Sequence, residues 1–262
     1  LVVACDTASA GALPALRAGV PIPVLGVVEP GARAAARESR AGFFHHVSTA
    51  FVAGKTDGPC PEAPVAPREF QNVYEETKCR GEALARGACA EAGLGLAIYR
   101  PSIVYGDSRT GRSLLFNAVY YPVRAALFLR DLYEKDIRER EGKRAAGLGV
   151  LIEPDGTVRL PLRIETADRG GLNLVPVDFF TKAFMALLEG APGGGVFHIV
   201  NSRTKRVEDL IDYSCRLFRI SGVRACRRAE FEAAPRNPLE ALYDRSIEAY
   251  GPYMRDTRTF ET

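Results

Sequence analysis

The sequence lacks the features that mark nucleic-acid-binding and membrane proteins. Its 35 basic and 32 acidic residues leave a net charge of only +3, so no strong field favours nucleic acid or an anionic membrane as the main partner. No run reaches the ~18 uninterrupted apolar residues of a spanning helix, because the best candidate, Leu114–Leu129, is broken by Asn117 and Arg124. We therefore expect a soluble, cytoplasmic protein that acts on a small molecule.

The six cysteines also lack a recognisable pattern. There is no CxxC pair and no spacing shared with the three histidines, so neither a zinc site nor a disulfide framework is indicated. No charged segment leads into an apolar stretch with a cleavage site, so we expect no secretory signal within the residues given. We expect reduced thiols and no bound metal.

The arrangement of apolar segments predicts an α/β fold. The chain has 262 residues, 47% of them hydrophobic, which suits one large or two small domains at ~100–200 residues each. Short apolar runs alternate with helix-like segments, as in βαβ units around a mainly parallel, doubly wound sheet. The expected strands are Leu1–Cys5, Val24–Val28, Phe43–Ser48, Gly95–Tyr99 and Val196–Val200, and the expected helices span 11–18, 31–40, 72–91 and 177–189.

Two later segments differ from this pattern and predict a second, smaller part. Residues 106–171 combine a helix-like aromatic run, a charged stretch and a hairpin-like Asp155-Gly156, whereas the tail from Arg206 to Thr262 looks helical. We predict a dinucleotide-binding-type core in 41–105 and 172–200, a sheet completed by 1–40, and a mostly helical substrate subdomain in 106–171 and 201–262.

Tyr74 and Lys78 form a Tyr-x-x-x-Lys pair within the expected helix 72–91. A spacing of four residues puts both side chains on one helix face. An ammonium beside a phenol lowers the phenol pKa, and such a tyrosine can exchange a proton with a carbonyl oxygen. Because short motifs recur by chance, the pair alone is a weak signal and fits a solvated helix face better than a catalytic site. Ser48 and Thr49 add context, since they end an expected strand where open parallel sheets bind ligands.

Four segments together resemble a known family. They are His46–Gly54, Tyr74–Lys78, Arg100–Gly106 and Asn173–Asp178. They are similar to the extended short-chain dehydrogenase/reductase superfamily, and in particular to the branch of fatty acyl-CoA reductases and thioester-reductase domains, over residues about 41–262. The resemblance implies a Rossmann-like oxidoreductase of lipid metabolism. It would reduce acyl thioesters or aldehydes with NADP, or with NAD as the alternative cofactor.

The resemblance also implies a role for each matching residue. Tyr74 would protonate the substrate oxygen as hydride arrives, and Lys78 would hold the nicotinamide ribose while lowering the pKa of Tyr74. Thr49 would hydrogen-bond the same oxygen, with Ser48 as the weaker candidate. The alternative for Thr49 is a strand-end hydroxyl satisfied by the backbone. The expected cofactor contacts are Ser48, Tyr74, Lys78, Pro101, Ser102, Ile103 and Val104.

The first forty residues depart from this family. A complete member opens with a Gly-rich turn that binds the cofactor pyrophosphate, and no G-x-G-x-x-G or G-x-x-G-x-x-G occurs in the chain. Instead, Leu1–Ala10 and Ile22–Ala32 are similar to glutamate racemases, with Cys5 in the position of one acid/base thiol. Because Leu1 already lies in a strand-like run, we expect the N-terminal segment of the reductase-like fold to be shortened or replaced.

Three alternatives stand beside the reductase. A catalytically silent Rossmann-like protein would keep Thr49, Tyr74 and Lys78 but lack the phosphate loop. A sugar-nucleotide epimerase or dehydratase of the same superfamily would share the catalytic set. A glutamate racemase is least expected, because the second catalytic thiol of that family, in a Cys-Thr-His setting, has no match here. The sequence is also compatible with a homo-oligomer.

Overall fold

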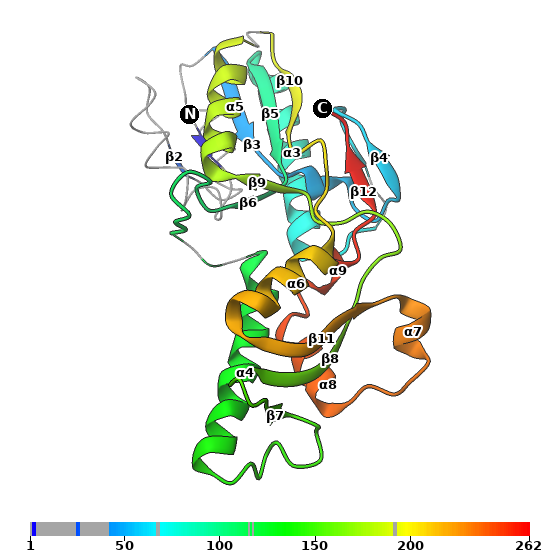
Figure 1. Ribbon diagram of the computed structural model, residues 1–262. Coiled ribbons are helices and arrows are strands. Elements are labelled where there is room, and N and C mark those ends of the chain that lie inside the picture. The colour runs from blue at the N-terminus through cyan, green and yellow to red at the C-terminus, as the bar shows by residue number, and fades with distance from the viewer. Residues whose placement is uncertain are drawn as a thin grey trace. The chain divides into compact units, whose positions relative to one another are not determined.

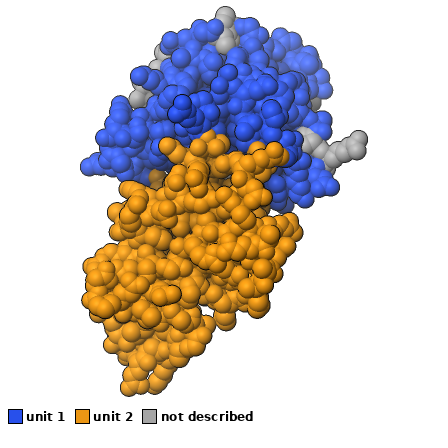
Figure 2. Space-filling view, turned by 45° about the vertical axis from the view of Figure 1, so that its right-hand side comes forward, with its two compact units in different colours: residues 1–116, 173–203, 258–262 blue, residues 117–172, 204–257 orange. Residues whose placement is uncertain are grey.

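The computed structural model describes residues 2–3, 25–26, 42–66, 69–114, 116, 118–190 and 193–262. These residues form two compact units (Figures 1 and 2). Unit 1 comprises residues 1–116, 173–203 and 258–262, and unit 2 comprises 117–172 and 204–257. Unit 1 therefore includes residues 106–116, 201–203 and 258–262, which the sequence-based division placed in the substrate subdomain, and unit 2 includes Leu172, which that division placed in the core. The expected helices 11–18 and 31–40 lie outside the described residues.

Unit 1 is built on a five-stranded parallel sheet in the order β10-β5-β3-β1-β2. Its strands are β1 (Val2–Val3), β2 (Leu25–Gly26), β3 (Phe43–Val47), β5 (Gly95–Pro101) and β10 (Gly195–Ile199). The chain crosses from one side of β3 to the other, as in doubly wound sheets. The predicted α/β fold is thereby confirmed.

Helices cover the two faces of this sheet (Figure 1). Helix α3 (Val73–Ala92) packs Ala85 and Ala88 against Phe44 of β3. Helix α5 (Val177–Gly190) packs Phe180 and Phe184 against Val47 and Tyr99 from the opposite face. Alternating residues of β3 thus face the two helices, which is why both faces of the strand carry large apolar side chains, with one histidine on each face.

Local signals set the ends of α3. The side chain of Asn72 caps the helix by accepting a hydrogen bond from the Glu75 amide at 3.0 Å. Gly93 ends it in the left-handed conformation, at φ 65°. The helix expected over 72–91 therefore agrees with the observed one to within a residue at each end.

Two short parallel pairs complete unit 1. Strand β6 (Ile103–Tyr105) pairs with β9 (Leu174–Pro176). Strand β4 (Gly58–Cys60) pairs with β12 (Arg258–Phe260), which brings residues from opposite ends of the sequence together. A short 3₁₀ helix, η1 (Ala50–Ala53), follows β3.

Unit 2 combines a three-stranded sheet with five helices among the described residues. The sheet order is β11-β8-β7, formed by β7 (Leu151–Ile152), β8 (Val158–Glu165) and β11 (Ile220–Cys226). The helices are α4 (Tyr120–Glu139), α6 (Val207–Phe218), α7 (Arg228–Glu232), α8 (Pro238–Ser246) and α9 (Gly251–Met254). Strand β8 alternates buried Val158, Leu160, Leu162 and Ile164 with more exposed residues.

The expectation of a helical tail over 206–262 was wrong at β12 and, over a longer stretch, at β11. This strand pairs with β8 along its length, with a register shift between Ser221 and Val223. The residue between them, Gly222, has φ 78°, and a side chain there would approach the carbonyl oxygen of Leu160. The glycine and the irregular register interrupt the alternation that identifies a strand in sequence.

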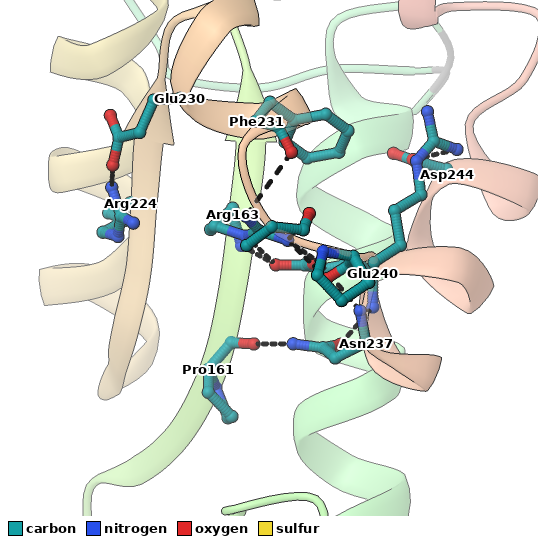
Figure 3. A network of polar contacts seen from close by, with 11 residues as sticks. Pro161, Arg163, Arg224, Glu230, Phe231, Asn237, Glu240 and Asp244 are labelled. Carbon is teal, nitrogen blue, oxygen red and sulfur yellow. Dashed lines mark hydrogen bonds and ion pairs between the residues drawn. The ribbon is translucent and has the colours of Figure 1, made fainter.

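A buried carboxylate organises unit 2 (Figure 3). Glu240, in the first turn of α8, accepts hydrogen bonds from Nε and Nη2 of Arg163 on β8, at 2.7 and 2.8 Å. It also forms a capping box with Asn237, whose side chain reaches the Pro161 carbonyl at 2.8 Å. The Phe231 ring lies near the Arg163 guanidinium, 5.3 Å from the ring centroid. These contacts fix α7 and α8 to β8.

No described helix is both long and apolar enough to cross a bilayer.

Candidate functional site

The residues expected to carry chemistry lie in unit 1, after the ends of β3 and β5 and in the first turns of α3. Tyr74 and Lys78 share one face of α3, and the Lys78 ammonium lies 5.9 Å from the centroid of the Tyr74 ring. Tyr74 is 41% exposed, whereas Lys78 is half-buried. The structure therefore brings this pair together and leaves the phenol accessible to a substrate.

Thr49 is buried between the ends of two strands. It caps η1, and its hydroxyl accepts a hydrogen bond from the Phe51 amide at 3.4 Å. The same hydroxyl donates to the Pro101 carbonyl, also at 3.4 Å. The backbone thus satisfies this hydroxyl in the structure, through two long contacts. To serve a substrate oxygen, the hydroxyl must rotate away from Pro101, since it has a single proton to donate.

Ser48 is fully buried and faces α3 rather than solvent. Its amide donates to the Tyr99 carbonyl at 2.7 Å. Its hydroxyl helps to lower the pKa of the Glu82 carboxyl, yet it has no hydrogen-bond partner among the described residues.

The segment Pro101–Val104 passes from the main sheet to the β6–β9 pair. The Ser102 amide donates to Ile199 of β10, and the Ile103 amide donates to Asn173, each at 3.2 Å. Asn173 in turn exchanges two hydrogen bonds with Asn201, at 2.8 and 2.9 Å. The segment is therefore fixed on both sides.

Sequence reasoning missed two buried ion pairs that hold α3. Arg100, the last residue before Pro101, donates two hydrogen bonds to Glu82, at 2.9 and 2.7 Å, and both side chains are buried. Burial alone would raise the pKa of Glu82, but the hydrogen bonds and charge of Arg100 hold it below its ordinary value. Near the start of the helix, Glu75 accepts from Arg258 of β12 at 3.0 Å. The first pair had a sequence signal, because Glu82 continues the four-residue spacing of Tyr74 and Lys78.

His46 lies buried on the α3 side of β3. No described residue gives a hydrogen-bond partner to either ring nitrogen, and the ring stacks on Phe44 with a centroid distance of 6.5 Å. Burial lowers the pKa of His46 to about 4. The negative charge of Glu82 acts to raise this pKa, whereas the positive charges of Lys78 and Arg86 act to lower it. The imidazole is therefore neutral near pH 7. His198 is also buried, with Nδ1 3.0 Å from the Glu261 carbonyl oxygen.

The described residues hold no cluster of three or more histidine, cysteine or acidic side chains suited to a metal ion. The segment between β1 and β2, where a cofactor phosphate cradle is expected, lies outside the described residues.

The sequence matches the model of a known protein family. The model of an NAD-binding family described as male sterility protein matches residues 20–184, which is more than half of the chain. The chain belongs to this family. The match to the male sterility family begins before residue 41, so it overlaps the segment that resembles racemases.

The fold of the chain is similar to that of solved reductase domains. The chain is similar to the terminal R domain of the myxalamid biosynthetic pathway, with a TM-score of 0.51 and 22% identity, over 76% of this chain and 43% of that one. It is also similar to the reductase domain of the aureusimine biosynthetic cluster, with a TM-score of 0.56 and 13% identity, over 93% of this chain and 62% of that one. These similarities confirm the predicted Rossmann-like fold, and together with the family match they support an extended short-chain dehydrogenase/reductase.

The racemase resemblance is confirmed as a partial match. Glutamate racemase of Limosilactobacillus fermentum is 52% identical over 61 residues, which is 23% of this chain and 22% of the racemase. Glutamate racemase of Geobacter metallireducens is 64% identical over 49 residues, or 19% of this chain and 18% of the racemase. The chain thus spans about a fifth of the curated relatives that it matches.

Proposed function

We propose that this chain is an NADP-linked reductase of acyl thioesters or aldehydes. The pairing of the exposed Tyr74 phenol with the Lys78 ammonium carries the proposal. Membership of an NAD-binding family supports it. So does the contact of α3, which carries the pair, with η1, which follows the carboxyl end of β3, where such folds bind ligands. In this proposal, unit 2 acts as the substrate subdomain.

The residues at the site fit the nicotinamide end of such a cofactor. An ammonium and an exposed hydroxyl can hydrogen-bond a ribose, and Pro101–Val104 offers a fixed, partly apolar segment for the ring. Lys78 and Tyr74 would hold the ribose, with Ser102, Ile103 and Val104 beside the nicotinamide. Ser48 is the weaker candidate because its side chain faces Glu82.

The residues of the chain supply the proton chemistry. When bound, the reduced cofactor supplies a hydride to the carbonyl carbon of the substrate. Tyr74 donates its phenolic proton to the carbonyl oxygen as negative charge develops there, and Lys78 stabilises the phenolate that remains. Thr49 orients the same oxygen after rotation of its hydroxyl. An aldehyde then gives an alcohol, whereas a thioester loses its thiol and gives an aldehyde.

A catalytically silent Rossmann-like protein is the second candidate. Two observations favour it: the sequence has no Gly-rich phosphate-binding motif, and the backbone occupies the Thr49 hydroxyl. Such a protein would keep the Tyr74–Lys78 pair without holding a dinucleotide.

Cofactor titration distinguishes the two candidates. We expect saturable enhancement of NADPH fluorescence, tighter binding of NADPH than of NADH, and at least ~10-fold weaker binding by Lys78→Met, which corresponds to about 1.4 kcal/mol. Lys182→Met removes the same charge from an exposed position of α5 and should bind as the wild type does. Binding that does not saturate up to millimolar NADPH would favour the silent protein.

A further inference from the structure

Arg258 connects the two segments that carry Thr49 and Tyr74. It lies on β12, is only 2% exposed, and donates through Nη2 to Glu75 at 3.0 Å and through Nη1 to the Gly54 carbonyl at 2.9 Å. Glu75 is 183 residues away in the chain. One guanidinium therefore bridges three segments that are distant in sequence.

The Glu75 end of this bridge is the turn of α3 that carries the proposed proton donor. Glu75 directly follows Tyr74, and its side chain is fully buried. Its second carboxylate oxygen accepts from the Gln71 amide at 3.0 Å, while its own amide donates to the Asn72 cap. Arg258 thus neutralises the carboxylate around which the start of α3 is organised.

The Gly54 end of the bridge is the 3₁₀ turn that begins at Thr49. Gly54 is the C-cap of η1, and Thr49 is its N-cap. The Arg258 guanidinium also lies over the Phe51 ring, 5.0 Å from its centroid. Phe51 meets Phe260 of β12 edge-on, with centroids 5.6 Å apart. The contacts of β12 with η1 are therefore both polar and aromatic.

We propose that Arg258 is a positioning residue, which holds the Tyr74 turn of α3 at a fixed place relative to the Thr49 turn. The proposal rests on the proposed function for its catalytic meaning. Its physical basis is the planar guanidinium, which holds two N–H donors in fixed directions, one toward the Glu75 carboxylate and one toward the Gly54 carbonyl. A lysine at this position can neutralise Glu75 but cannot also reach Gly54 with a second fixed donor.

Amide hydrogen exchange tests the positioning without any assay of activity. In Arg258→Met, we expect the Glu75 and Glu76 amides of α3 to exchange at least ~10-fold faster, while amides in the centre of β5 stay within ~2-fold, since local opening is separable from global opening. Arg258→Lys should give an intermediate rate. Phe180→Leu, a core change on the α5 side of the sheet, provides a destabilised control in which β5 and α3 exchange faster together.

Steady-state kinetics test the catalytic consequence. Misplacement by about 1 Å can cost ~10²-fold in rate, so Arg258→Met should lower kcat by ~10- to 10²-fold while the KM for NADPH stays within ~2-fold. Arg258→Lys should recover part of kcat, and Phe180→Leu, assayed well below its Tm, should keep it.

Three outcomes would overturn the assignment of Arg258. They are unchanged exchange at Glu75 and Glu76, exchange that rises uniformly through unit 1, and a normal kcat in Arg258→Met. If the wild type reduces no thioester or aldehyde, the proposed function fails, yet the exchange measurement still decides whether Arg258 holds the start of α3.

Discussion

Replacing Tyr74 by phenylalanine is expected to lower kcat for carbonyl reduction by ~10²- to 10⁴-fold, the usual contribution of a positioned acid or base. Phenylalanine keeps the ring that lies 5.9 Å from the Lys78 ammonium and removes only the hydroxyl. Binding of NADPH should therefore stay within a few-fold of the wild-type value. The measurement is the steady-state rate of NADPH consumption with an aldehyde at saturation, together with the fluorescence titration.

A matched control separates this effect from the general loss of a tyrosine hydroxyl. Tyr213 lies on α6 of unit 2 and is 58% exposed, so Tyr213→Phe should leave kcat unchanged. A Tyr74→Phe variant with the full wild-type kcat would remove Tyr74 from the mechanism.

The second large effect is expected on stability, at Glu240 of unit 2. Glu240→Ala leaves the Arg163 guanidinium, whose side chain is 14% exposed, without its carboxylate, and also removes the capping box of α8. Breaking one partner of a buried pair costs about 3–5 kcal/mol. We expect a loss of that size in the free energy of unfolding of unit 2, measured by denaturant titration.

Two variants calibrate this prediction. Glu240→Gln keeps the shape and an acceptor, so its cost should be smaller, about 1–3 kcal/mol. Glu230→Gln removes the carboxylate that pairs with Arg224 at a half-exposed position (Figure 3), and an exposed pair contributes at most about 1 kcal/mol. Equal losses in Glu240→Ala and Glu230→Gln would contradict a central role for the Glu240 network.

Acid should act on the same carboxylate. Burial raises the pKa of Glu240, but hydrogen bonds from Arg163 and Asn237 outweigh it and hold the pKa below its ordinary value. A lowered pKa in the folded state means that the stabilisation is present above the unfolded-state pKa and is lost as pH falls through the folded-state value. Stability of the wild type should therefore decline in acid by more than that of Glu240→Gln.

The regular elements of unit 1 could be predicted from sequence because their signals are local. The strands β3, β5 and β10 are short apolar runs bounded by breakers, and α3 has its Asn72 cap and its terminal Gly93. The Tyr74–Lys78 contact could also be predicted, since a helix fixes the spacing of its own residues.

Long-range polar contacts could not be predicted in this way. The β4–β12 pair consists of three-residue strands near opposite ends of the sequence, and neither strand has a pattern of its own. Glu75 and Arg258 look like ordinary surface charges until the fold buries them together. The backbone contacts of the Thr49 hydroxyl likewise depend on Pro101, which lies 52 residues away.

Hydride transfer tests the central claim most directly. The wild-type chain is incubated with NADPH that carries deuterium at the transferable position and with a medium-chain aldehyde or acyl-CoA, and the products are analysed by mass spectrometry. The account predicts one deuterium at the former carbonyl carbon for each reduction step, and its loss in Tyr74→Phe. Saturable binding of NADPH with no deuterated product from either substrate class would contradict it and would indicate a chain that binds the dinucleotide but does not reduce these substrates.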